Sequence, residues 1–270
     1  LMQFVTLITR PIQGDFAITY RNQQEVMALI AERFPATLEL VVVSTVIALC
    51  VGIPLGVYAA IRKGSPIARL LTMFSMIGVS IPSFVIGILL ILVFAVQLNW
   101  LPAFGRGEIV KFGTWSRGLL TPSGRQALIM PAASLAMFQI SFIMRLVTAE
   151  MLEVLRTDYI KFARARGLPN RLVHFRHALK NCLMPVVTMT GMMIGDLIAF
   201  ALVTETVFQW PGMGQLFVQA VMFIDMPVMA AYLMIVSAIF VTINTIVDLI
   251  YLWVDPRLRQ TGVARGSYAH

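Results

Sequence analysis

Histidine and cysteine side chains are the usual metal ligands, and this sequence has few of them. His174 and His177 are three residues apart, a spacing that suits two metal ligands on one face of a helix. Cys182 is the one further candidate close to them in the sequence. Because a zinc site needs three or four protein ligands, we predict no metal site. No catalytic constellation of side chains is evident in the sequence, so we also predict no catalytic residue. The sequence has no Gly-x-x-x-x-Gly-Lys-Ser/Thr phosphate loop, so we expect the chain not to hydrolyse ATP by itself.

A carboxylate inside a long apolar stretch is the sharpest candidate for function. Asp196 lies near the middle of residues 183–204. A charge in lipid is costly, so such a residue has a functional role as its default interpretation. Asp196 either lines a pathway and contacts a cationic or amine group of a substrate, or it pairs with a polar group on a neighbouring helix or subunit. We also place Phe200 and Ser83 on this candidate pathway.

Three other charged residues lie near the ends of apolar stretches. Arg145 and Asp248 are each within one or two turns of such an end, where a side chain can extend to the interface. Glu39 lies near the start of its stretch, and we expect it to contact water.

The composition is that of a polytopic membrane protein. Of 270 residues, 59% are hydrophobic and 13% are charged, whereas soluble domains average about 45–50% and 25%. The mean hydropathy is +0.83. In a membrane protein, excess Lys and Arg are found mainly in the cytoplasmic loops. We therefore attribute the net charge of +8 to such loops and expect lipid, not nucleic acid, as a partner. Cys50 and Cys182 lie in or beside apolar stretches, which favours buried free thiols.

Five apolar stretches are long enough to cross a bilayer, which needs about 20 residues, so we predict an all-α protein. A proline within Ile81-Pro82-Ser83 predicts a kink in the second of them. We further expect a short amphipathic helix at 25–34 and a wet loop at 98–126. The expected spans are 36–61, 70–97, 127–148, 183–204 and 228–254.

The distribution of Lys and Arg predicts the orientation. The segments 62–69, 149–182 and 255–270 together hold about 13 Lys/Arg in roughly 58 residues. The remaining loops hold about 7 in roughly 89 residues. We therefore expect an external N-terminal segment, 1–36, a transmembrane domain, 37–254, and a cytoplasmic tail, 255–270.

The polar stretch 150–181 is expected to face the cytoplasm as a helix, a tight turn and a second helix. Gly167 and Pro169 supply the stop, and Asn170 can cap the second helix. In the first helix, apolar residues recur at three- and four-residue spacing: Leu152, Leu155, Tyr159 and Phe162. An exposed apolar stripe among basic residues is typical of an element that docks onto a partner.

This stretch also carries a family resemblance. The segments DYIKFARARGL and RHALKNCLMPVVT resemble the cytoplasmic EAA loop of ATP-binding-cassette (ABC) importer permeases, most closely the dipeptide/oligopeptide/nickel branch and its B-type permease. Lys161-Phe162-Ala163 stands where the general pattern has Glu-Ala-Ala, and Gly167 matches its glycine. Asp196 and Phe200 depart from the branch, which usually has an uncharged and a small residue there.

Further stretches resemble the same branch in the right order along nearly the whole chain. They are Glu32–Leu40, Gly52–Gly56, Ser80–Phe84, the Glu-x-x-Phe-x-x-Pro-Gly-x-Gly motif from Glu205 to Gly214, and the C-terminal stretch from Asn244 to Arg257. Permeases of this branch have six spans, so the resemblance implies that the first family helix would lie upstream of Leu1.

The resemblance implies a type I importer fold with two permeases, two ATPase subunits and an external solute-binding protein. ATP and Mg would bind the ATPases, and no cofactor would bind this chain. The external motif, Glu205, Phe208, Pro211, Gly212 and Gly214, would face the binding protein or close the pathway. ATPase docking is assigned to Leu155, Asp158, Tyr159, Phe162, Ala163, Arg164, Ala165, Arg166 and Gly167.

Dipeptides or oligopeptides are the leading cargo, and nickel chelates, glutathione and opines remain alternatives. A self-sufficient channel is the alternative from another class, and it would need oligomerisation because Asp196 is the one deep charge. A membrane enzyme would need paired catalytic groups within the spans, and none are evident.

Overall fold

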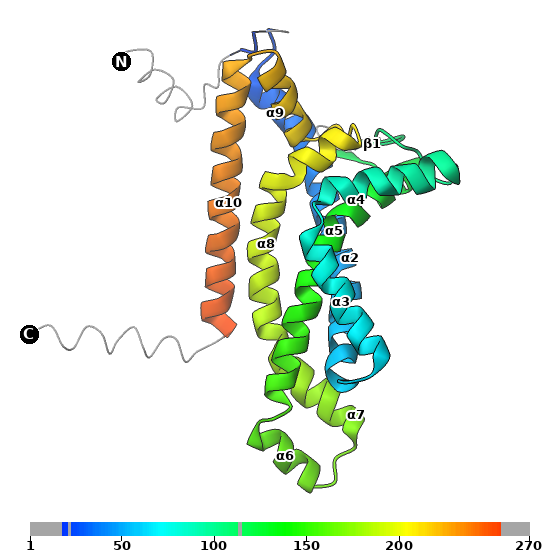
Figure 1. The fold of residues 1–270 in the computed structure, drawn as a ribbon. Helices are drawn as coiled ribbons and strands as arrows, with labels where there is room; N and C mark the ends of the chain where they lie inside the picture. The colour runs from blue at the N-terminus through cyan, green and yellow to red at the C-terminus, as the bar shows by residue number, and fades with distance from the viewer. Residues whose placement is uncertain (1–17, 21–22, 113–114, 255–270) are drawn as a thin grey trace, which may run out of the picture. The chain divides into compact units, whose positions relative to one another are not determined.

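The structure, a computed structural model, describes residues 18–20, 23–112 and 115–254 (Figure 1). The chain divides into two compact units, which are described separately here. The first unit comprises 1–47, 80–138 and 196–240, and the second comprises 48–79, 139–195 and 241–270. Four long helices contribute residues to both units: α2 (Val26–Ile61), α5 (Pro122–Val154), α8 (Leu179–Val207) and α10 (Met226–Val254).

Helix α2 differs from the prediction because it is one continuous helix of 36 residues. The expected short helix at 25–34 and the first span join through Pro35. Packing explains the continuity, since Val26 and Ile30 are 0% and 3% exposed. Both belong to a core cluster with Met213, Ala220, Val228, Ala231 and Tyr232. The N-terminal turns of α2 are therefore held in the first unit by tertiary contacts.

The predicted kink at Pro82 is confirmed, and it is a complete break. Helix α3 (Pro66–Ser80) ends two residues before Pro82. Helix α4 (Ser83–Leu90) begins directly after Pro82 and continues as the π-helical segment η1 (Ile91–Gln97). The chain bends by 104° at this point. Proline disfavours helical geometry in the residue before it, here Ile81, and donates no backbone hydrogen bond, and Pro82 itself is extended, with φ −58° and ψ 140°. The second expected span is thus a bent pair instead of one helix.

Both loops that the sequence predicts on the external side contain additional secondary structure. Residues expected to form a wet loop include the antiparallel strands β1 (Val110–Phe112) and β2 (Trp115–Arg117), with Val110 opposite Arg117. Helix α9 (Met213–Met222) lies between α8 and α10, in the segment between the fourth and fifth expected spans. The third, fourth and fifth spans are present as α5, α8 and α10.

Within the described residues, four helices are long and apolar enough to cross a membrane, or five if the bent pair counts as one span. The prediction of an all-α polytopic fold is confirmed, apart from the short hairpin. In the second unit, glycines let helices approach closely. A Cβ at Gly56 of α2 would lie 2.7 Å from Cβ of Val147 on α5. Thr148 of α5 donates a hydrogen bond to the Gly56 carbonyl at 3.2 Å.

Candidate functional site: an exposed helical hairpin and a buried external motif

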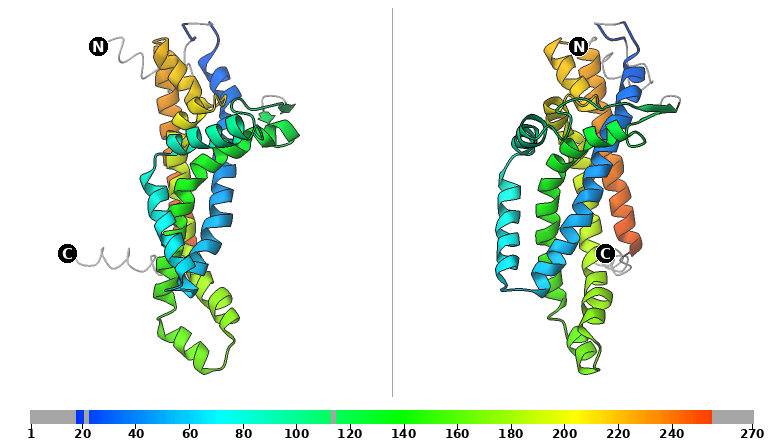
Figure 2. Two further views of the ribbon diagram at one scale, coloured as in Figure 1. Left: turned by 45° about the vertical axis from the view of Figure 1, so that its right-hand side comes forward. Right: turned by 90° about the vertical axis from the view of Figure 1, so that its right-hand side faces the viewer.

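The basic stretch folds as the predicted helix, turn and helix. Helix α6 (Asp158–Ala165) is followed by a turn in which Gly167 has a positive φ of 77°. The second helix is α7 (Asn170–Leu172), which continues as the π-helical segment η2 (Val173–Ala178) into α8. Helix α6 contacts η2. The views in Figure 2 show these helices as a hairpin that extends past the end of α5.

Two details of the prediction for this hairpin are wrong. Leu152 and Leu155 do not share a helix with Tyr159, because α5 ends at Val154 and a turn precedes α6. The Thr157 amide and hydroxyl both donate to the Val154 carbonyl, at 3.1 and 2.6 Å, which closes that turn. Asn170 is the first residue of α7 and not its cap. The cap position is Pro169, which makes no capping hydrogen bond.

The face of α6 that lies inward is not the predicted apolar stripe. Ile160 and Ala163 are buried, whereas Tyr159 and Phe162 are 42% and 65% exposed. The Tyr159 hydroxyl donates to the His177 carbonyl at 3.3 Å and accepts from the Asn181 amide at 2.5 Å, so it ties α6 to the returning helix. The buried Ile160 and Ala163 therefore anchor helix α6, and Phe162 is left exposed to solvent.

Most of the remaining predicted docking residues are solvent-exposed. The Arg166 guanidinium lies 5.7 Å from the centre of the Phe162 ring. Lys161 and Asp158 form an exposed ion pair at 2.8 Å. The other exposed residues are Arg164, Ala165 and Gly167, while Leu155 is half-buried. This surface combines an aromatic ring with several cations and suits binding to an acidic protein surface better than chemistry.

The histidines of the hairpin both lie in η2. Among the described residues, no group of three His, Cys, Asp or Glu side chains is arranged to hold a metal ion.

The external motif is packed into the first unit. Glu205 is fully buried at the end of α8, where it accepts hydrogen bonds from the Thr37 hydroxyl at 2.6 Å and the Gln215 amide at 3.0 Å. The Met213 amide donates to the same Thr37 hydroxyl at 2.8 Å. These bonds fasten the loop after α8 and the start of α9 to helix α2.

Both glycines of this motif are required by close packing. A Cβ at Gly212 would collide with the Glu205 carboxylate, and a Cβ at Gly214 would collide with Leu202. Phe208 is also buried, with its ring against Gly87 of α4. Pro211 is half-buried. The spacing of the motif therefore reflects packing inside this chain.

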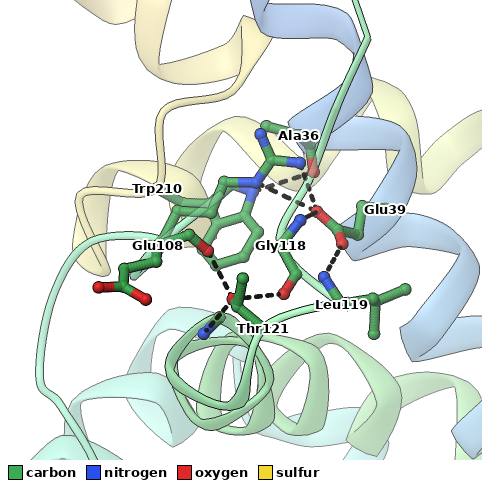
Figure 3. Close-up of polar contacts among 9 residues, drawn as sticks. Ala36, Glu39, Glu108, Gly118, Leu119, Thr121 and Trp210 are labelled. Atoms are coloured by element: carbon green, nitrogen blue, oxygen red, sulfur yellow. Dashed lines mark hydrogen bonds and ion pairs between the residues drawn. The ribbon is translucent and has the colours of Figure 1, made fainter. Parts of the chain in front are cut away.

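A second buried network, which the sequence did not reveal, adjoins the motif in the first unit (Figure 3). The Glu39 carboxylate is paired with Arg106 and accepts hydrogen bonds from the amides of Gly118 at 3.3 Å and Leu119 at 2.6 Å. The expectation that Glu39 contacts water is wrong, because its side chain is 7% exposed.

This network includes Trp210, which is completely buried. Its indole donates to the Ala36 carbonyl at 2.9 Å, and the Arg106 guanidinium lies 5.6 Å from its ring centre. The available signals were a charged residue at the start of a span and one of the three arginines in a glycine-rich loop. Residues so far apart in the sequence gave no local sign that they pair.

The predicted pathway residues lie on two helices of the first unit. Asp196 and Phe200 are both exposed on α8, one turn apart. Ser83 is the first residue of α4 and is half-buried.

Comparison with known proteins places the chain among transport permeases. The model of the family "Binding-protein-dependent transport system inner membrane component" matches residues 52–260. The oligopeptide transport system permease protein AppB of Bacillus subtilis is 39% identical over 95% of this chain and 80% of its own length. The dipeptide transport system permease protein DppB of Alkalihalophilus pseudofirmus is 35% identical over 91% of this chain and 78% of its own length.

Solved structures support the fold. A chain of the MetNI methionine ABC transporter in an inward-facing conformation has a TM-score of 0.66 at 22% identity, covering 85% of this chain and 97% of its own. A second crystal form gives 0.69 at 20% identity. The two sequence relatives named above are transport permeases by name. The chain belongs to the family of binding-protein-dependent transport system inner membrane components.

Proposed function

We propose that this chain, a permease subunit of an ABC importer, carries dipeptides or oligopeptides across the inner membrane. A second permease, which we expect to be a different chain of related fold, would complete the pathway. The names of the relatives, which include dipeptide and oligopeptide permeases, support this cargo. Nickel chelates, glutathione and opines are the alternative cargoes, because an external binding protein would select the solute before it enters the pathway.

The observation that carries the proposal is the exposed surface of the α6–α7 hairpin. Phe162 is 65% exposed although its neighbours on the inner face are buried. Aromatic rings flanked by arginines are typical of residues that contribute strongly to protein interfaces. We assign this surface to one of two ATPase subunits, which would bind ATP and Mg and supply the energy for transport. The hairpin would then be cytoplasmic and residues 1–36 external.

The external motif has a structural role in this proposal. The buried Glu205 and Phe208 cannot touch an external protein directly without rearrangement. They would instead hold the loop at Pro211 in the form that a solute-binding protein meets, or that closes the pathway. Asp196, Phe200 and Ser83 would line that pathway.

The test is purification of the chain with its partners in a gentle detergent, with and without Gly167→Pro. Proline requires a φ near −65°, so it cannot adopt the 77° found at Gly167. Gly64→Pro is a matched control, because Gly64 also has a positive φ, of 93°, and lies in the short basic loop after α2. At both glycines, a Cβ would have no atom within 4 Å apart from those of the glycine and its two chain neighbours.

We expect the wild type and Gly64→Pro to retain two ATPases and a second permease, and Gly167→Pro to lose the ATPases. Retention of ATPases by Gly167→Pro would show that the hairpin turn is not the docking element. Failure of the wild type to retain any ATPase would contradict the proposal that this chain is part of an ABC importer. Conductance measurements would then test the alternative of an oligomeric channel.

A further inference from the structure

Asp196 lies deep in a membrane-spanning helix. At 1.5 Å per residue it is about 25 Å from Leu179 and about 16 Å from Val207, the two ends of α8. Apolar residues precede and follow it along the helix. At this depth a carboxylate has no contact with either aqueous surface unless something opens the protein to water.

The side chain of Asp196 is on the outer face of α8 in the first unit. Residues on the opposite face are buried, with Leu197 at 9%, Ile198 at 3% and Ala201 at 0% exposure. Phe200 and Val203 share the outer face with Asp196 and are 69% and 41% exposed. No hydrogen bond or ion pair to the Asp196 carboxylate is found among the residues that the structure describes.

Lipid is a poor environment for this face. Placing Asp at the centre of a membrane helix costs at least about 2.5 kcal/mol. The same face would be favourable if it bordered a water-filled pathway, where the carboxylate stays hydrated between transport events. We therefore assign the outer face of α8 around Asp196 to the pathway of the proposed importer.

The neighbouring ring indicates which chemical group this face binds. Residues four apart on a helix are neighbours on its surface, so Phe200 lies beside Asp196. An ammonium ion is attracted both by a carboxylate and by the face of an aromatic ring. A neutral or anionic group gains neither interaction. The pair is therefore suited to an organic ammonium group.

We infer that Asp196 and Phe200 form a subsite for the ammonium group of the cargo within the translocation pathway. This inference rests on the proposed function and deepens it, because it names the chemical group that the permease itself recognises. For a peptide, the amino terminus supplies this group. The alternative is that Asp196 pairs with a cation of the second permease and contributes to assembly alone.

The experiment uses the complete importer with its binding protein in proteoliposomes. Dialanine serves as the probe because its amino terminus is its single ammonium group. Uptake and ATP hydrolysis are measured together for the wild type and for Asp196→Asn, Asp196→Glu and Phe200→Ala. Asp248→Asn is the matched control, since Asp248 is an exposed carboxylate of the long apolar helix α10 near its end.

We expect Asp196→Asn to lower the dialanine transported per ATP by about tenfold, the effect of one charge-assisted hydrogen bond. Asp196→Glu should restore most of the ratio, Phe200→Ala should lower it less, and Asp248→Asn should leave it unchanged. An unchanged ratio in Asp196→Asn would overturn the inference. So would loss of the second permease from the purified Asp196→Asn complex, which would indicate an assembly role. Absence of dialanine uptake by the wild type would instead contradict the proposed cargo.

Discussion

The external motif and the α6–α7 hairpin differ in where their side chains find partners. In the external motif, Glu205 and Trp210 are fully buried and both hydrogen-bond to helix α2. In the hairpin, Phe162 is largely exposed and the Lys161–Asp158 ion pair lies in solvent. One region is completed by its own chain, whereas the other leaves its apolar and charged groups available.

This difference shows that a sequence motif can be explained either by packing within its own chain or by binding to a partner. A glutamate and two glycines at fixed spacing suggest a binding site, yet in this chain packing within the first unit explains their spacing. Gly212 leaves space for the Glu205 carboxylate, and Gly214 leaves space for Leu202. In the hairpin, the exposed Phe162 ring and the exposed cations are not explained by packing within the chain. Substitutions should therefore affect stability in the first region and partner binding in the second.

The largest effect on stability is expected for Glu39→Ala. The change removes the carboxylate that pairs with buried Arg106 and accepts the Leu119 amide. Breaking a buried ion pair costs about 3–5 kcal/mol, so the unfolding midpoint in detergent should fall markedly. Arg106→Ala and the double variant complete a thermodynamic cycle. The double variant should lose less than the sum of the single variants, and simple additivity would contradict the coupling.

A smaller loss is expected for Glu205→Ala. The Thr37 hydroxyl and the Gln215 amide would lose their acceptor in a buried setting, at a cost of about 2–3 kcal/mol. The same unfolding measurement tests this value. Thr206→Ala is the control, because Thr206 is the next residue but is exposed, and its hydroxyl donates to the Leu202 carbonyl of the same helix. Equal losses in the two variants would argue against a fastening role for Glu205.

Local patterns in the sequence were sufficient for the helices and for the hairpin turn. Apolar length predicts α5, α8 and α10, and Pro82 predicts the break before α4 because proline acts on its own neighbours. The turn at Gly167 is equally local, and its positive φ agrees with the prediction. These features could be predicted because the residues that determine them are adjacent in the chain.

Contacts between distant segments could not be predicted in this way. The bond between Thr37 and Glu205 joins residues 168 positions apart, and no local pattern marks either as a partner of the other. The continuity of α2 has the same origin, because Val26 and Ile30 pack against α9 and α10. The prediction of an apolar stripe in the hairpin was wrong for a different reason. Its period spans the turn at Leu155, where the helix axis is interrupted.

The smallest effect on stability is expected for Phe162→Ala, together with a large effect on binding. Since the ring is 65% exposed, the free energy of unfolding should change by less than about 0.5 kcal/mol. Retention of the ATPases during purification should fall at least about tenfold, because exposed aromatic anchors dominate interfaces. Phe104→Ala, at a 54% exposed phenylalanine in the loop after η1, should change neither quantity. A Phe162→Ala protein that is destabilised but retains its ATPases would reverse the contrast between the two regions, because the hairpin would then be a structural element.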